Sequence, residues 1–195
     1  MNFFKKLFSG KSHNQDENKN RVPLKEVYTE DYHAKRYLEE KLDKSNELVD
    51  GSLKMLKSYF IDTQTEEPIV EPINHPKNID AAVQEGMGFY RYCKLFEQED
   101  KQIGLTLTMA FSFYMVENFG FVLYKDKSPE YPLRFMTLQF NNDGGVISLY
   151  PFEYSLKVLN GEASFNELVE KVKNNLQTIP TASEFLDKLK EDLFN

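Results

Sequence analysis

The chain has 195 residues, and its 24 Lys and Arg against 31 Asp and Glu give a formal net charge of −7. This acidic balance argues against general nucleic-acid binding, which needs a basic excess to neutralise phosphates. No apolar run approaches the ~20 residues that cross a bilayer. The single cysteine excludes an intrachain disulfide and fits a reducing, cytoplasmic compartment.

Residues 1–21 are expected to form an amphipathic start and a flexible linker. On a helix, the first eight residues would place apolar and basic side chains on two sides: Phe3, Phe4, Leu7 and Phe8 opposite Lys5 and Lys6. Such a strip predicts a weak peripheral contact with anionic lipid at the inner membrane face. The alternatives are a disordered start or packing on its own domain, and vesicle flotation with and without residues 1–8 would distinguish them. Residues 9–21 lack bulky apolar side chains, which favours a linker.

Residues 22–195 are expected to form a single α+β domain that begins with a helical pair over residues 24–60. In the first helix, apolar residues keep a roughly helical spacing as far as Leu42. The second begins after Ser45 and Asn46, which can cap it. Prolines then recur every four residues and predict an extended connector over residues 63–77: Pro68, Pro72 and Pro76.

The core of the domain is expected over residues 78–195. One helix is predicted over residues 79–97, and a second over 103–118 is apolar nearly all round, which is typical of a buried central helix. The period then changes to that of a three-stranded antiparallel meander, formed by residues 121–124, 133–140 and 146–150 with a hairpin turn at 141–145.

After Pro151 the helical period returns. Two capping boxes, beginning at Ser164 and Thr181, predict the starts of the last two helices. The fold class predicted from these elements is α+β, with helices packed on one face of a three- or four-stranded antiparallel sheet.

No catalytic, cofactor-binding or metal-binding residues are predicted. The histidines His13, His33 and His75 share no ligand spacing, and Cys93 has no CxxC partner. Cys93 lies within a predicted helix, where a free thiol usually acts as a small core hydrophobe. Adjacent acids are most simply solvated faces: Glu39 and Glu40, Glu66 and Glu67, and Glu191 and Asp192.

Aromatic side chains are dense where the predicted central helix meets the first strand of the meander: Phe111, Phe113, Tyr114, Phe119, Phe121 and Tyr124. The simpler interpretation is a packed seam of the core. The functional alternative is an apolar pocket or a groove for a partner.

The segment over residues 104–162 resembles small bacterial domains of unknown function, which have a buried helix, a β-meander, a proline and a further helix. The matching features here are Gly104 to Gly120, the strands up to Tyr150, Pro151, and the run from Lys157 to Glu162. The chain departs from such domains at Phe121-Val122, where a Trp is usual. Domains of this kind occur among toxin-immunity and accessory proteins, and the resemblance implies no catalytic residues.

Two functions are therefore considered. The favoured one is a cytoplasmic, non-enzymatic interaction module of the immunity or accessory type, whose acidic surface would steer a basic partner protein. The alternative is a hydrolase or transferase with a site built from scattered carboxylates. A deep pocket that holds perturbed carboxyl groups would favour the enzyme, and a shallow apolar patch with an acidic rim would favour the interaction module.

Overall fold

The computed structural model describes residues 34–64, 68–84, 88–142 and 145–194. The chain divides into two units, Met1–Lys35 and Arg36–Asn195, and the elements given below lie in the second. The predicted linker over residues 9–21 and the predicted membrane contact lie outside the described residues and stay predictions: Phe3, Phe4, Lys5, Lys6, Leu7 and Phe8. Among the described residues, no helix is both long and apolar enough to span a bilayer.

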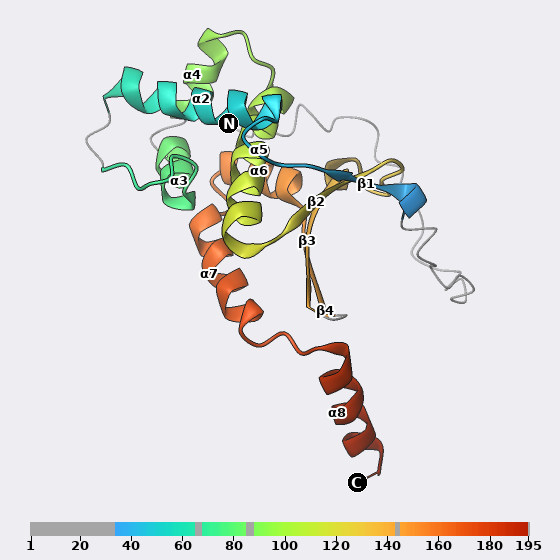
Figure 1. The fold of residues 1–195 in the computed structure, drawn as a ribbon. Helices are drawn as coiled ribbons and strands as arrows, with labels where there is room; N and C mark the ends of the chain where they lie inside the picture. Colours follow the sequence, from blue (N-terminus) through green and yellow to red (C-terminus); the bar gives the residue numbers. More distant parts are fainter. Residues whose placement is uncertain (1–33, 65–67, 85–87, 143–144, 195) are drawn as a thin grey trace, which may run out of the picture. The chain divides into compact units, whose positions relative to one another are not determined.

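The α-helices of the described part of the chain are α2 Glu47–Thr63, α3 Pro76–Gln84, α4 Gly88–Leu95, α5 Asp100–Phe119, α6 Pro151–Leu159, α7 Phe165–Leu176 and α8 Ala182–Phe194, and a 3-10 helix, η2, covers Pro132–Arg134 (Figure 1). The second predicted helix is confirmed as α2, where Asn46 accepts hydrogen bonds from the backbone N–H groups of Leu48 and Val49. The predicted connector over residues 63–77 is too long at both ends, because Thr63 ends α2 and Pro76 begins α3, where a proline is tolerated in the first turn. Residues 68–75 between these helices hold no helix or strand.

The sheet has four antiparallel strands in the spatial order β1-β2-β3-β4: β1 Tyr37–Glu40, β2 Val122–Asp126, β3 Met136–Asn142 and β4 Gly145–Leu149. Side chains alternate between the faces of a strand. Leu123 therefore lies opposite Leu138 on the buried face, whereas Gln139 lies opposite the exposed Ser148. α5 contacts β2 and α6 contacts β3. The fold is α+β, with helices packed on an antiparallel sheet, as predicted.

The predicted end of the first helix is wrong, because part of that segment is the strand β1. Residues 34–36 form a helical turn, but Tyr37–Glu40 is β1 and pairs with β2, so that Glu40 lies opposite Leu123. The helical spacing that runs to Leu42 is coincidental in this part, because pairing with a distant strand overrides local preference.

The predicted helix over residues 79–97 is two helices, α3 and α4, with residues 85–87 between them outside the described residues. Gly88 begins α4 directly against Tyr59 of α2. A Cβ at Gly88 would lie 2.5 Å from the Tyr59 hydroxyl, so only glycine permits this approach without movement of the ring. Gly88 therefore allows the start of α4 to pack closely on α2.

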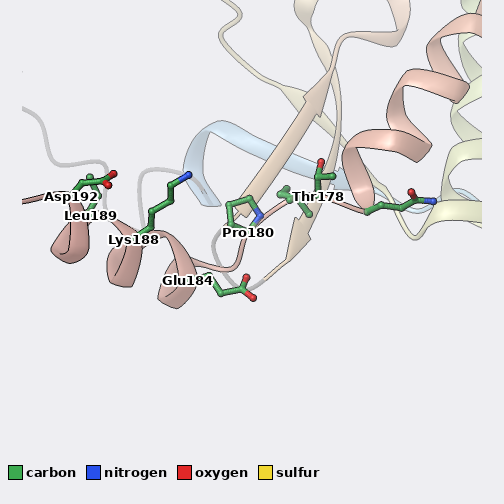
Figure 2. A pocket seen from close by; sticks show the side chains of 8 residues that line it. Thr178, Pro180, Glu184, Lys188, Leu189 and Asp192 are labelled. Carbon is green, nitrogen blue, oxygen red and sulfur yellow. The ribbon is translucent and has the colours of Figure 1, made fainter. Parts of the chain in front are cut away.

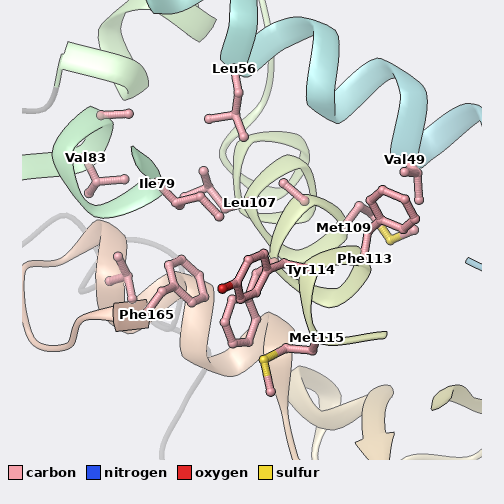
Figure 3. Close-up of a cluster of buried hydrophobic side chains, with 14 of the residues drawn as sticks. Val49, Leu56, Ile79, Val83, Leu107, Met109, Phe113, Tyr114, Met115 and Phe165 are labelled. Carbon is pink, nitrogen blue, oxygen red and sulfur yellow. The ribbon is translucent and has the colours of Figure 1, made fainter. Parts of the chain in front are cut away.

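The predicted central helix is confirmed as α5, which carries buried residues on all sides. Figure 3 shows side chains from α2, α3 and α7 converging on it, with Val49 near Phe113, Ile79 near Leu107 and Phe165 on another side. Four aromatic residues of the predicted seam are buried, which supports the core interpretation: Phe111, Phe113, Tyr114 and Phe121.

One buried carboxylate ties α3 to the start of α7. Asp80 Oδ1 accepts the N–H of Phe165 at 2.8 Å, and Oδ2 accepts the N–H of Asn166 at 2.9 Å and the hydroxyl of Ser164 at 2.7 Å. Ser164 Oγ in turn accepts the N–H of Glu167, as predicted for a helix cap. Asp80 thus satisfies backbone donors that the helix itself leaves unpaired.

Candidate functional site

The C-terminal helix α8 is the clearest candidate interaction surface in the described part of the chain. It begins at the predicted capping box: the Thr181 N–H donates to Glu184 Oε2 at 2.7 Å, and the Glu184 N–H donates to Thr181 Oγ1 at 3.2 Å. Every described side chain from Ser183 to Asp192 is exposed, including Leu186 at 54% and Leu189 at 40%. The two leucines and the groove described next are here called the α8 surface.

A groove of about 700 Å³ runs between α8 and the segment that precedes it (Figure 2), and its lining residues are Gln177, Thr178, Ile179, Pro180, Glu184, Lys188, Leu189 and Asp192. Glu184, Lys188 and Asp192 are spaced four residues apart and so line one side of the helix. The hydrogen bonds from the backbone N–H and the hydroxyl of Thr181 lower the pKa of Glu184, which keeps it ionised. The groove therefore combines the apolar side chains of Ile179, Pro180 and Leu189 with a charged edge.

A polar cluster lies elsewhere, around Arg134. The rings of Tyr131 and Tyr150 lie 5.0 and 4.6 Å from the Arg134 guanidinium, whose Nε donates to Glu153 at 2.7 Å. These four residues, here called the Arg134 cluster, were not singled out in the sequence. They lie on two segments, residues 131–134 and 150–153, and only the packing of η2 against α6 brings them together.

An ion pair between a half-buried arginine and a buried carboxylate lies beside this cluster. Arg36 Nε donates to both carboxylate oxygens of Asp126 at 3.0 Å, and Nη2 donates to Oδ2 at 2.7 Å. Burial of Asp126 acts to raise its pKa, but the hydrogen bonds from Arg36 and from the Ser128 N–H outweigh it, so that the pKa is lowered. The pair connects the start of β1 to the end of β2.

Replacing Arg36 with Gln is expected to lower the free energy of unfolding by about 2–3 kcal/mol near pH 7. The reason is that Asp126, with 4% of its side chain exposed, would lose its counterion. In the wild type the lowered pKa gives stability that is present above the unfolded value of about 3.9 and is lost as the pH falls through the folded pKa. In the variant the lowering by Arg36 is lost, while burial still raises the pKa and the Ser128 N–H bond still lowers it. Asp126 should therefore take up its proton at a higher pH than in the wild type, and the deficit should shrink as the pH falls towards 4.

Urea unfolding at several pH values checks this expectation. Lys54→Gln is the matched control, because it removes the exposed Lys54–Asp50 pair, which is worth little. A deficit for Arg36→Gln that is equal at pH 7 and pH 4 would contradict the assignment of the loss to the Asp126 charge.

The structure describes two of the residues that were considered in the sequence for nucleophilic or metal chemistry, Cys93 and His75. Cys93 is fully buried, and burial raises the pKa of its thiol to about 12, so it packs as the small hydrophobe that was expected. The His75 ring lies 5.3 Å from that of Tyr114, and its pKa is lowered by burial and then by Lys77 and Lys173. In the described ranges, no three His, Cys, Asp or Glu residues gather as metal ligands do.

The shifted carboxyl groups bear on the enzyme alternative. The pKa is lowered, not raised, at five described carboxyl groups: Asp43, Asp100, Asp126, Glu153 and Glu184. Each accepts hydrogen bonds from a cation, a hydroxyl or a backbone N–H group. A general acid needs the opposite shift, so these groups lend the carboxylate-enzyme hypothesis no support.

Comparisons of the chain with protein-family models, with curated proteins and with solved structures found no match.

Proposed function

We propose that the protein is a non-enzymatic interaction module that binds another protein through the α8 surface. The observation that carries the proposal is the exposure of Leu186 and Leu189 along a terminal helix beside an open groove. Single exposed leucines are common on soluble proteins. A pair on one short helix that flanks a groove is the pattern of an unfilled binding surface.

The length of α8 adds a thermodynamic argument. The helix has 13 residues, and isolated helices of that length are marginally stable in water. Helical stability in proteins comes chiefly from packing of an apolar face, but the described side chains of α8 are exposed. A partner that covers the leucines would supply that packing, and α8 would gain stability on binding.

The charge of α8 indicates the kind of partner. The helix carries four acids and two lysines over its described length: Glu184, Asp187, Glu191 and Asp192, with Lys188 and Lys190. The whole chain has a net charge of −7. An apolar segment flanked by basic residues would match both the leucines and the acidic rim, and the long-range field would steer its approach.

The wider assignment follows from the sequence. A cytoplasmic location and a role of the immunity or accessory type are proposed from the single cysteine and the resemblance of residues 104–162. The peripheral membrane contact of residues 1–8 stays a separate prediction.

The test compares three full-length chains as baits in host lysate. These are the wild type, the double variant Leu186→Asp/Leu189→Asp, and the control Asn174→Asp/Asn175→Asp, which adds the same charge at exposed positions of α7. We expect a protein that is retained by the wild type and the control but lost by the leucine variant. After purification, its Kd should rise at least about tenfold for the leucine variant, as for a hot-spot residue.

Two results would overturn the proposal. One is capture of the same proteins by all three baits. The other is self-association of the wild type, measured by sedimentation, that the leucine variant abolishes, because the occupant of the α8 surface would then be a second copy of the chain.

A further inference from the structure

The Arg134 cluster holds its guanidinium in a defined orientation. Arg134 ends η2, and Tyr131 precedes that turn, whereas Tyr150 precedes the first residue of α6. Both rings lie within 5.0 Å of the guanidinium carbon, a distance at which the ring face attracts the cation. The two contacts and the Nε bond to Glu153 leave the side chain little freedom.

The bonds of this guanidinium leave donors available. A guanidinium has five N–H donors, and within the described residues the hydrogen bond of Arg134 is that from Nε to Glu153 Oε2. The second oxygen of Glu153 pairs with Lys157 Nζ at 2.9 Å, so Glu153 is shared between two cations. The terminal Nη groups of Arg134 therefore remain able to donate, and 41% of its side chain is exposed.

A cavity of about 100 Å³ adjoins these groups, and its lining residues are Arg36, Tyr37, Asp126, Glu130, Tyr131, Arg134, Thr137 and Tyr150. The space equals that of about three liquid water molecules, or one small anion. Asp126 is neutralised by Arg36, so the remaining carboxylate of the lining is that of the exposed Glu130. Its side chain can turn into solvent.

We propose that this cavity binds a single oxyanion group, phosphoryl or carboxylate, through the Nη groups of Arg134. The planar fork of a guanidinium matches two oxygens of either group and forms short, charge-assisted hydrogen bonds. Stacking by Tyr131 and Tyr150 holds that fork in place before the ligand arrives, which reduces the ordering cost of binding. The site is independent of the α8 surface and of the function proposed for it.

The test uses the full-length protein labelled with ¹⁵N. Inorganic phosphate and acetate are titrated separately against sodium chloride at constant ionic strength, and the Arg134 Nε–H signal and the Thr137 and Tyr150 amide signals are followed. We expect saturable shifts at these positions. Saturation by phosphate alone assigns the site to phosphoryl groups. Saturation by both anions shows that the site also binds carboxylates.

Three variants sharpen the result. Arg134→Lys keeps the charge but loses the fork, and should weaken binding at least about tenfold. Arg91→Lys, at an exposed position of α4, is the matched control and should leave binding unchanged. Glu130→Gln removes a negative charge, which would repel the anion, from the exposed edge of the cavity without disturbing the core. It should strengthen anion binding at least about twofold.

The proposal is overturned if the shifts do not saturate, if they are equal in Arg134→Lys and the wild type, or if chloride produces them at the same concentration. Should Arg134→Lys fail to fold, Glu130→Gln still decides the matter, because unchanged or weaker anion binding in that variant also contradicts the site.

Discussion

Replacing Phe111 with alanine is expected to lower the free energy of unfolding by about 3–5 kcal/mol. The Phe111 side chain is fully buried in α5, and its ring lies 4.4 Å from that of Phe165 in α7. The substitution loses the transfer free energy of the ring and leaves a cavity between two helices that close only in part. Urea unfolding followed by circular dichroism measures the loss.

Leu95→Ala is the control for this experiment, because Leu95 is 79% exposed at the end of α4. Its effect should stay within about 0.5 kcal/mol. If Phe111→Ala cost as little as Leu95→Ala, α5 could not be the central helix of the core.

Replacing Asp80 with alanine is expected to cost about 3 kcal/mol, because it removes a charged acceptor of three hydrogen bonds. Asp80 is 6% exposed, so water cannot replace it well at the N–H groups of Phe165 and Asn166. The negative charge also lies at the positive end of the α7 dipole. Equilibrium unfolding measures the loss.

Asp80→Asn separates the charge from the packing. The amide oxygen of the new side chain can still accept a hydrogen bond from one of the donors, but its NH₂ group faces the other donors. The loss in free energy of unfolding should therefore lie between zero and the loss for Asp80→Ala. Asp187→Ala, which removes an exposed carboxylate of α8, should change stability by no more than about 0.5 kcal/mol. Equal losses at Asp80 and Asp187 would show that α7 does not depend on the cap.

Local signals in the sequence predicted most of the helices. The apolar run of α5, the caps at Ser164 and Thr181, and Pro151 at the start of α6 each act within a few residues, so their effect can be read from the chain alone. The alternation over residues 133–140 likewise predicted β3, with a shift of boundary where η2 intervenes.

Non-local contacts account for the differences. β1 was expected to be helical because Ala34, Leu38 and Leu42 keep helical spacing. Its strand conformation depends on β2, which lies far along the chain. The close approach of Gly88, at the start of α4, to Tyr59 likewise depends on a residue of another helix.

The candidate sites were predicted to different extents. The sequence indicated the α8 helix through its capping box at Thr181, but the exposure of Leu186 and Leu189 depends on what packs against the helix. The Arg134 cluster had no sequence signal, since tyrosines near an arginine are common and their stacking is a matter of tertiary geometry.

The order of the strands has a consequence for the route of folding. Between Glu40 and Val122 the chain passes through α2 to α5, so pairing β1 with β2 closes a loop of about 80 residues, at an entropic cost of about 4 kcal/mol. The β3–β4 hairpin closes across residues 143–144 alone. The meander can therefore nucleate locally, and β1 is the strand expected to join last. Its contacts would then slow the unfolding of the native protein while adding little to the speed at which it folds.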